Sequence, residues 1–523
     1  MKRFLGNFFI KIKFTQIIIV EVEKMDKKSY FRIINNRKAY PKLNENLSCD
    51  VLIIGAGLMG LSMAYEMLPY TNDIVIIDQN HIFQNTTSST TAKITYQHGY
   101  IYHDLINEKG LDNALLYKEF NELGTKRIKE IITRENIDCD YKEVDSYLFA
   151  LNNKEEQNLS NEEFAYKLLN IKYEKVRIDS RLSNYEALKV KNQGRFNIYK
   201  YLDNLANLLE EKGVKFFENT KVIEVNNKKR PFAKTLDNYM VLANTIIVCT
   251  HYPFYKKFNF YFMKMIPQIA YAAIGEANYQ ITDANYINAS KDETYAIRYI
   301  EIDGKNYYLI SGLSHDANQF KNPFEEMNKL MAFGKNKLGI TDYYYAWTGQ
   351  DYKAIDTFPY IGKVKEDIYI ASCFNKWGIS QSSAGAILIK DLIIKGTSKF
   401  EEAFNPKRIK INNKFISYNL KMVKTIAKTK IFPQGKNLTL STNTGKVVKI
   451  NGKLLGIYKD EEEKLYIVKA SCPHMGCGLR FNPIDRTYDC KCHGSRFTYT
   501  GKKIDGPAKF DLEKLEESLI LSE

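Results

Sequence analysis

A glycine-rich turn between two short apolar runs is the feature that most constrains the fold of this chain. Residues 51–54 (VLII) lead into Gly55-Ala56-Gly57-Leu58-Met59-Gly60, which fits the pattern G-x-G-x-x-G. Residues 58–68 have helical character, and residues 74–77 (IVII) form a second apolar run that precedes Asp78. This order of strand, glycine turn, helix and strand predicts a βαβ unit that binds a dinucleotide.

The residues of this unit have separate tasks. Gly55 permits the tight turn, Gly57 lets the backbone approach a pyrophosphate, and Gly60 lets the helix pack on the strand. The N-terminus of the helix then faces the phosphates. Asp78 lies 23 positions after Gly55, which is the spacing expected for a carboxylate that binds the ribose 2′-OH. The pattern alone does not separate NAD from FAD.

Further segments resemble the glycine/D-amino-acid oxidase (DAO) family of FAD enzymes. They are residues 49–55 (CDVLIIG), the hydroxyl-rich segment 86–94, and residues 221–225 (KVIEV), 245–250 (TIIVCT), 356–362 (DTFPYIG) and 369–385. The resemblance covers roughly residues 48–400 and implies an α/β FAD-binding domain, Rossmann-like and of the glutathione-reductase/DAO type. A second dinucleotide pattern is absent, so no built-in NAD(P)H domain is expected. The FAD contacts that the resemblance implies are Gly55, Gly57, Gly60, Asp78, Thr90, Thr91, Val222, Gly362 and Gly378.

A tyrosine-rich region over about residues 255–345 is predicted to form a mostly antiparallel sheet on the substrate side. Arg298 lies in this region and is a candidate partner for a substrate carboxylate. A lone arginine is more often a surface or structural residue, and we assign no catalytic residue. Cys373 stands where the family usually has glycine, so it is either a flavin attachment point or a buried structural thiol.

The cysteines are unevenly distributed. Half of the eight cysteines fall between residues 472 and 492. Cys472-Pro473-His474 is followed by Cys490-Lys491-Cys492-His493, and two cysteines with two histidines suffice for a tetrahedral zinc site. The full pattern C-x-H-x-G-C…C-x-C-H-G-S, however, resembles the Rieske family, especially its respiratory branch. That resemblance favours an iron–sulfur cluster over zinc.

The Rieske resemblance implies a small antiparallel β domain with two cluster-binding loops. Its cofactor is a [2Fe–2S] cluster, with two cysteines on one iron and two histidines on the other. By resemblance, Cys472 and Cys490 bind one iron, His474 and His493 bind the second, and Cys477 and Cys492 form a disulfide between the loops.

Two residues beside the expected cluster are expected to influence its reduction potential. Ser495 stands where family members donate a hydroxyl hydrogen bond to a bridging sulfide, and Phe497 stands where high-potential members have tyrosine. Hydrogen bonds to sulfur stabilise the reduced cluster. We therefore predict a reduction potential below that of the respiratory type.

The domain order follows from these motifs. We expect an N-terminal extension over residues 1–45, the FAD-dependent oxidoreductase domain over 46–400, a basic linker without a clear core pattern over 401–432, and the Rieske domain over 433–523. Residues 4–10 and 17–20 are short apolar runs interrupted by lysines. They resemble neither a signal peptide nor a transmembrane helix. Residues 1–24 are either a dispensable extension, with Met25 as an alternative start, or a segment that lies on a membrane surface.

The net charge is +15, from 76 Lys and Arg against 61 Asp and Glu. It reflects either attraction to an acidic partner or a general compositional bias. No nucleic-acid recognition motif is found. We expect a cytoplasmic protein without a transmembrane segment, with peripheral membrane association left open. An electron-carrier protein or a quinone is the expected redox partner.

Together the motifs predict a flavin–iron–sulfur oxidoreductase. The expected reaction oxidises a small amine or amino acid, N-methylated ones included, at FAD and sends electrons singly through the cluster to an external acceptor. A dehydrogenase is favoured over an oxidase because the cluster offers electrons a route other than O₂. Two alternatives stay open: a carrier-fed reductase with the reverse electron flow, and a non-catalytic redox sensor. A Rieske oxygenase is disfavoured because His98 and His103 lack its iron-ligand pattern.

Overall fold

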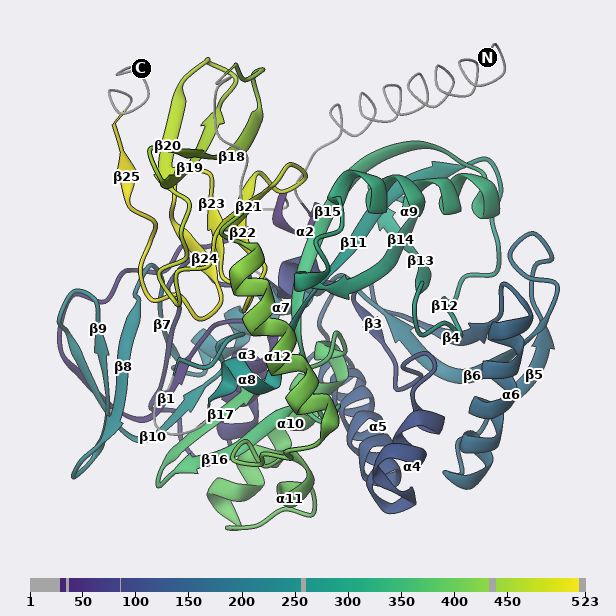
Figure 1. Cartoon of the computed structure of the whole chain (residues 1–523). Helices are drawn as coiled ribbons and strands as arrows, with labels where there is room; N and C mark the ends of the chain where they lie inside the picture. The colour runs from purple at the N-terminus through teal and green to yellow at the C-terminus, as the bar shows by residue number, and fades with distance from the viewer. Residues whose placement is uncertain (1–28, 34–36, 85, 255–259, 432–438, 517–523) are drawn as a thin grey trace.

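A computed structural model describes residues 29–33, 37–84, 86–254, 260–431 and 439–516. Figure 1 shows a large α/β part, coloured purple to green, and a smaller β part, coloured yellow-green to yellow, packed against it. The larger part contains two sheets, and the smaller part contains two four-stranded sheets.

The first sheet of the larger part is the predicted dinucleotide-binding sheet. Its main strands run in the order β16-β17-β10-β1-β2-β7, and the neighbours from β17 to β7 are parallel. Its strands carry apolar side chains on both faces, because one face packs on the long helices of the larger part and the other face packs in a second apolar cluster made mostly of strand residues. The strands are β1 (Leu47–Ile54), β2 (Ile74–Ile77), β7 (Lys215–Phe217), β10 (Met240–Val248), β16 (Tyr360–Lys365) and β17 (Ile368–Ser372), with the hairpin β8 (Val222–Asn227) and β9 (Pro231–Thr235) attached to β10.

Helix α3 (Leu58–Met67) connects β1 to β2 and is buried along its whole length. It packs on α10 (Gly378–Ile394), which in turn packs on α5 (Leu111–Arg134). The predicted βαβ unit is therefore present and lies in the centre of the domain. The remaining helices are α2 (Tyr30–Ile33), α4 (Tyr102–Lys109), α6 (Asn153–Leu168), α7 (Ile198–Glu211), α8 (Tyr261–Lys264), α9 (Pro323–Leu338), α11 (Glu401–Phe404) and α12 (Asn413–Lys428), with 3₁₀ turns η1 (Thr87–Ser89) and η2 (Ala317–Gln319).

The second sheet has the order β15-β11-β14-β13-β12-β4-β6-β3. It is antiparallel except where β12 pairs with β4, which agrees with the mostly antiparallel sheet predicted from the tyrosine-rich region. The sheet also recruits strands from much earlier in the chain. Its strands are β3 (Lys93–Ile94), β4 (Lys142–Phe149), β5 (Glu174–Arg177), β6 (Glu186–Arg195), β11 (Met265–Ala277), β12 (Asn285–Asn288), β13 (Tyr295–Ile302), β14 (Lys305–Asp316) and β15 (Ile340–Ala354).

The smaller part is all β, as predicted. One sheet has the order β18-β19-β20-β25 and the other β21-β22-β23-β24. Every pairing within them is antiparallel. The strands are β18 (Thr444–Ile450), β19 (Lys453–Lys459), β20 (Leu465–Lys469), β21 (Leu479–Asn482), β22 (Thr487–Cys490), β23 (Arg496–Thr498), β24 (Lys503–Asp505) and β25 (Lys514–Leu515).

The expected linker over residues 401–432 is largely helical. Residues 413–428 form α12, whose side chains at 418, 422 and 425 are buried at helical spacing. The Tyr418 hydroxyl donates a 3.2 Å hydrogen bond to the Met265 carbonyl, and the Asn419 amide donates one of 3.0 Å to Met263. The sequence pattern did not predict this helix because only a narrow face of it is buried.

The expected N-terminal extension is also partly folded. Phe31 is fully buried, and the Arg37 guanidinium pairs with the buried Glu218 carboxylate at 2.5 Å. Tyr40 stacks on Phe216. The domain therefore begins well before residue 46. The apolar runs at residues 4–10 and 17–20 lie outside the described residues. Across the part that is described, no helix is long and apolar enough to cross a bilayer.

Candidate functional site

One cavity of about 1220 Å³ joins the two parts of the molecule. Its lining includes the glycine turn and Asp78 from the larger part, and His474 and residues 503–510 from the C-terminal β part. Its volume exceeds the range of roughly 300–1,000 Å³ that is usual for drug-sized ligands. A cavity of this size suits a long ligand such as a dinucleotide.

The glycine turn leaves no room for side chains. Gly55 has φ +111°, and a Cβ there would lie 2.7 Å from the Cys249 carbonyl oxygen. A Cβ on Gly60 would lie 1.9 Å from the Gly55 carbonyl oxygen, which is the close helix–strand packing expected of the third glycine. Gly57 caps α3 and lines the cavity. The turn thus presents bare backbone to a ligand at the helix N-terminus.

Asp78 stands at the end of β2 and lines the same end of the cavity. Its carboxylate accepts hydrogen bonds from the backbone N–H groups of Ala56 and Asn80, both at 2.9 Å. Burial raises the pKa of Asp78 to about 6, against the lowering effect of these two N–H groups. A hydroxyl donor on the ligand would further stabilise the charged carboxylate.

The other residues that were expected to contact FAD differ in whether they line the cavity. Thr90, Thr91, Val222 and Gly378 line the cavity. Gly362 does not line it, because its position on β16 faces another part of the fold. Gly362 has φ +138°, and a Cβ there would meet Pro406 at 3.2 Å. A contact between Gly362 and FAD therefore stays a prediction from the resemblance.

Arg298 is likewise away from the cavity wall. It is 2% exposed, and its Nη2 donates a 3.4 Å hydrogen bond to the Phe196 carbonyl. It is therefore a buried arginine rather than a side chain of the cavity lining, which removes the support for direct contact with substrate. Lys93, which belongs to no recognised sequence motif, lines the cavity instead. Burial, aided by the nearby charge of Arg298, lowers the pKa of Lys93 to about 7.

The expected cluster ligands converge at one end of the smaller part. The rings of His474 and His493 have their centroids 5.0 Å apart. Hydrogen bonding with the Cys490 thiol lowers the pKa of Cys472 to about 7, so these two thiols are in contact. The Nδ1 atom of His493 is buried without a hydrogen-bond partner among the described residues. An unpartnered buried imidazole nitrogen is costly unless it binds a metal.

Backbone hydrogen bonds within each loop, and a disulfide between the loops, hold the two loops that carry these residues. The Cys472 N–H donates to the Cys477 carbonyl at 2.8 Å, and the Cys490 N–H donates to the Ser495 carbonyl at 2.8 Å. Cys477 and Cys492 form a disulfide between the loops, as the resemblance predicts. The sulfurs of Cys477, Cys490 and Cys492 lie within 4.8 Å of one another, but the disulfide leaves only Cys490 as a thiol.

Both residues that bear on the cluster potential are buried. The Ser495 hydroxyl oxygen accepts a 3.0 Å hydrogen bond from the Ala508 N–H, which ties the loop at residues 506–508 to the ligand loop. Phe497 on β23 is fully buried in the same apolar cluster as Cys472 and Cys490. The phenyl ring therefore adds no hydrogen-bond donor near the expected cluster.

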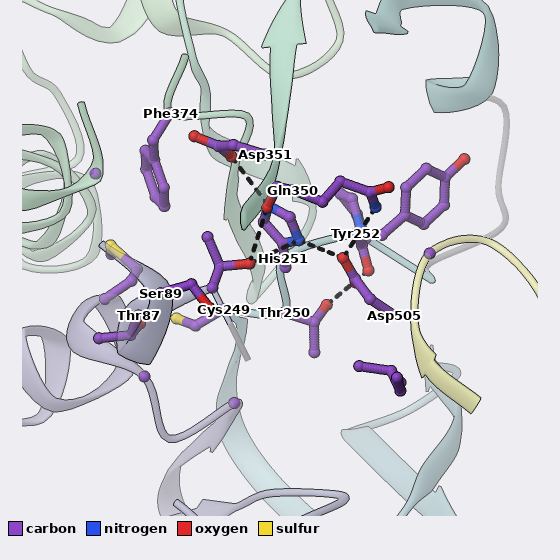
Figure 2. A pocket seen from close by; sticks show the side chains of 18 of the residues that line it. Thr87, Ser89, Cys249, Thr250, His251, Tyr252, Gln350, Asp351, Phe374 and Asp505 are labelled. Atoms are coloured by element: carbon purple, nitrogen blue, oxygen red, sulfur yellow. Dashed lines mark hydrogen bonds and ion pairs between the residues drawn. The ribbon is translucent and has the colours of Figure 1, made fainter. Parts of the chain in front are cut away.

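A histidine between two carboxylates bridges the two parts at the cavity wall. His251 Nδ1 lies 2.6 Å from the Asp505 carboxylate, and its Nε2 lies 2.9 Å from Asp351 (Figure 2). Burial alone would lower the pKa of His251, but the two carboxylates outweigh it and raise the pKa to about 10. The same contact lowers the pKa of Asp505 against the effect of burial. His251 is therefore an imidazolium that holds the domains together.

Further contacts reach the cluster loops from the larger part. Tyr352 on β15 donates a 3.1 Å hydrogen bond to the His493 carbonyl. The neighbouring Gln350 donates one of 2.7 Å to the Gly494 carbonyl. From α8, the Phe262 ring lies edge-on to His474 and His493, with centroid distances of 5.8 and 5.5 Å. Both histidine rings thus contact the larger part, and His474 also stays partly exposed.

Comparison with known proteins identifies both parts. The family model described as FAD dependent oxidoreductase, DAO, matches residues 50–392. The chain belongs to the DAO family. The model of the Rieske [2Fe-2S] domain matches residues 430–516, so this DAO-family oxidoreductase carries a C-terminal Rieske domain. Its cofactors are accordingly FAD and a [2Fe–2S] cluster.

Individual relatives resemble this DAO-family protein over most of its length. YhfW of Bacillus subtilis, named as a Rieske 2Fe-2S iron–sulfur protein, is 33% identical over 496 residues, which are 93% of this chain and 97% of YhfW. The gamma-glutamylputrescine oxidoreductase of Escherichia coli is 22% identical over 402 residues, or 72% of this chain and 91% of that protein. The crystal structure of glycine oxidase from Geobacillus kaustophilus has a TM-score of 0.57 at 14% identity and covers 70% of this chain and 100% of its own, which shows a shared fold.

The residues present fit both cofactors. The glycine turn offers bare backbone N–H groups at a helix N-terminus, where a pyrophosphate binds. The second site offers two thiols in contact and two facing imidazoles, one with a buried unpartnered nitrogen. Two cysteines and two histidines are the donor set of a Rieske centre. The sequence did not predict Lys93, Phe262 or the pairing of His251 with Asp505, because only the fold brings these residues to the cavity.

Proposed function

We propose that this oxidoreductase is a dehydrogenase that oxidises a small amine or amino acid, N-methylated ones included, and delivers the electrons through its Rieske cluster to an external acceptor. The observation that carries the proposal is the single cavity, which extends from the glycine turn to His474. When bound, FAD supplies a hydride acceptor and the cluster a one-electron relay. Oxidation of the substrate C–N bond to an imine releases one hydride and one proton, so two electrons leave for each substrate.

The chain would hold the two cofactors with separate groups of residues. Gly55, Gly57 and Asp78 would bind the dinucleotide, supported by Thr90, Thr91, Val222 and Gly378 along the cavity. Cys472 and Cys490 would bind one iron, and His474 and His493 the other. His251, Tyr352 and Phe262 would fix the distance between the sites through their contacts with the Rieske domain.

The cavity contains cations that suit a substrate carboxylate. Lys93 and Lys376 both line it. Burial, together with the charge of Lys353, lowers the pKa of Lys376 to about 8. A carboxylate bound near such side chains restores their positive charge and gains charge-assisted hydrogen bonds. This arrangement favours an amino acid over a plain amine, in agreement with the names of the oxidoreductase from E. coli and the glycine oxidase.

The external acceptor would reach the cluster from the solvent side of the ligand loop. His493 is 3% exposed, whereas His474 is only partly buried and its neighbours Pro473 and Met475 are exposed. An electron-carrier protein or a quinone could therefore approach His474. The net charge of +15 would attract an acidic carrier protein, and this attraction would be strongest at low ionic strength.

The test is an anaerobic titration of the purified holoprotein with amines, amino acids and N-methyl amino acids. Visible absorption reports the flavin, and EPR reports the Rieske centre. The proposal predicts that one substrate class bleaches the flavin and produces the Rieske EPR signal without added mediator. Bleaching by no amine or amino acid, with both centres present and reducible by dithionite, would contradict it.

A further inference from the structure

Helix α12 presents an aliphatic stripe to solvent. Ile416, Leu420 and Val423 are 48, 61 and 66% exposed and are spaced i, i+4, i+7, so they lie on one face of the helix. The opposite side, with Tyr418 and Met422, is buried against the protein. Figure 1 shows α12 on the near surface of the molecule, between the C-terminal β part and α11. Exposed aliphatic side chains in a row are unusual unless they bind something.

Lysines flank this stripe on one side. Lys421, Lys424 and Lys428 are exposed and are spaced i, i+3, i+7, so they share a second face. Within the described residues, none of these three has an ion-pair partner. The helix itself contains no Asp or Glu. Its exposed surface is therefore apolar along one line and positively charged along the next.

The same character extends beyond the helix. From residue 403 to residue 459 the sequence has 13 Lys and Arg and no Asp or Glu. Ile411 just before α12 is 73% exposed, and Ile431 just after it is 74% exposed. The region therefore combines a continuous excess of positive charge with exposed aliphatic residues at both ends of the helix.

From this surface we infer that α12 docks this protein on the surface of an anionic lipid bilayer. A basic amphipathic helix with aliphatic residues on its other face is typical of interfacial membrane binding. Protein interfaces are instead enriched in aromatic residues and Arg and depleted of Lys, whereas the exposed residues of α12 are aliphatic or Lys apart from Asn413 and Ser417, and none is aromatic or Arg. The lysines would contact lipid phosphates while the side chains of Ile416, Leu420 and Val423 enter the boundary of the acyl chains.

The docked orientation would bring the Rieske centre toward the bilayer. Tyr418 and Met422, on the buried face of α12, belong to the same apolar cluster as Cys472, Cys477 and Cys490. A membrane on the exposed face of α12 would then lie on the side of the molecule where the cluster ligands are packed. Docking of α12 on a bilayer does not depend on the direction of electron flow.

The test is flotation of the full-length holoprotein with vesicles of phosphatidylcholine, with or without phosphatidylglycerol. The protein is expected to float with anionic vesicles, to remain behind with neutral ones, and to bind less at high salt. Each lysine near an anionic surface strengthens binding about fivefold. The triple variant K421E/K424E/K428E should therefore bind at least about a hundredfold more weakly. The double variant L420E/V423E should lose binding as well, because it places charge in the apolar stripe.

Matched variants distinguish a docked helix from charge alone. K172E/K212E/K335E changes the net charge by the same amount at exposed lysines elsewhere, and F164E/L168E places two acids on exposed apolar positions of α6. Both should bind anionic vesicles as the unaltered protein does. Flavin absorption and the Rieske EPR signal of each variant show that it has folded. The inference is overturned if the unaltered protein does not float with anionic vesicles, which would point to a protein partner on α12. It is also overturned if L420E/V423E binds normally, or if the control lysines matter equally.

Discussion

His251 Nδ1 lies 2.6 Å from the Asp505 carboxylate, although the two residues are 254 positions apart and belong to different domains. The second ring nitrogen contacts Asp351 at 2.9 Å, so the imidazolium is shared between the strand that follows the Rieske cluster loops and the strand beside the flavin cavity. A buried cation between two carboxylates is costly to break, because removing it leaves uncompensated charges. This contact therefore fixes how the Rieske domain sits on the flavin domain.

The His251 contact predicts a specific dependence of stability on pH. The pKa of His251 rises from 6.5 to about 10 on folding, so the stability that it contributes is complete below about pH 6.5 and is lost as the pH rises through about 10. H251Q should lower the free energy of unfolding by on the order of 3 kcal/mol at pH 6, and by less at pH 10. Thermal or urea unfolding of the holoprotein at both pH values measures this difference. H81Q, which removes a half-exposed histidine paired with Glu218, serves as the control. Equal losses at both pH values for H251Q would contradict the role of His251.

The glycine turn predicts a selective loss of FAD. G55A places a Cβ 2.7 Å from the Cys249 carbonyl oxygen at a φ of +111°. The strain of about 1–3 kcal/mol corresponds to roughly a 5- to 150-fold loss of FAD affinity. The ratio of flavin absorbance to protein measures it, and the Rieske EPR signal should persist. G304A is the matched control, because Gly304 also has a positive φ (+76°) but nothing lies within 4 Å of its added Cβ. Full FAD occupancy in G55A would argue against the proposed binding mode.

The buried phenyl ring at position 497 predicts a low cluster potential. By resemblance to high-potential members, F497Y adds a hydroxyl that donates to a ligand sulfur. A hydrogen bond to a charged group contributes about 1.5 kcal/mol or more, which raises the potential of a one-electron centre by about 60 mV. A redox titration followed by EPR measures the change, and F481Y provides a second added hydroxyl in the same domain. A potential that is unchanged or lower in F497Y would refute the prediction.

Lys93 predicts how substrate binding depends on pH. With a pKa of about 7, lowered mainly by burial, its ammonium is charged below that pH and neutral above it. KM for a substrate with a carboxylate should rise as the pH passes about 7. K93M should raise KM about tenfold or more at pH 6, because a charge-assisted hydrogen bond worth about 1.5–3 kcal/mol is lost, and should remove the pH dependence. K335M, at an exposed lysine on α9, should behave as the unaltered enzyme. A pH profile of KM that K93M leaves intact would rule out Lys93 as the carboxylate partner.

The sequence was most informative where chemistry depends on neighbours in the chain. The glycine turn with Asp78 and the two Cys–His loops each occupy a short segment, so their spacing predicts the local structure. Contacts between distant segments were not predictable: His251 meets Asp505, and Phe262 meets His493, only because the two domains pack together. Gly362 and Arg298 show the converse. Their residue types suit a flavin or a carboxylate, but the fold places them beside Pro406 and Phe196 and not in the cavity lining.

Helix α12 shows why the secondary structure of a lysine-rich segment is difficult to predict from sequence. Its buried face is limited to a few positions such as Tyr418 and Met422, and exposed aliphatic residues on another face blur the helical period. A helix with two apolar faces gives no clear amphipathic pattern. The lysines then dominate the composition, which made the segment resemble a linker.

In the proposed reaction, electrons pass from the flavin site to the cluster within one chain. The most direct measurement mixes the holoprotein anaerobically with its substrate, stops the reaction by rapid freezing, and follows the Rieske EPR signal over time at several protein concentrations. The signal should follow flavin bleaching with a first-order rate that is independent of protein concentration. A rate that increases with protein concentration, or a cluster that stays oxidised while the flavin is bleached, would contradict it.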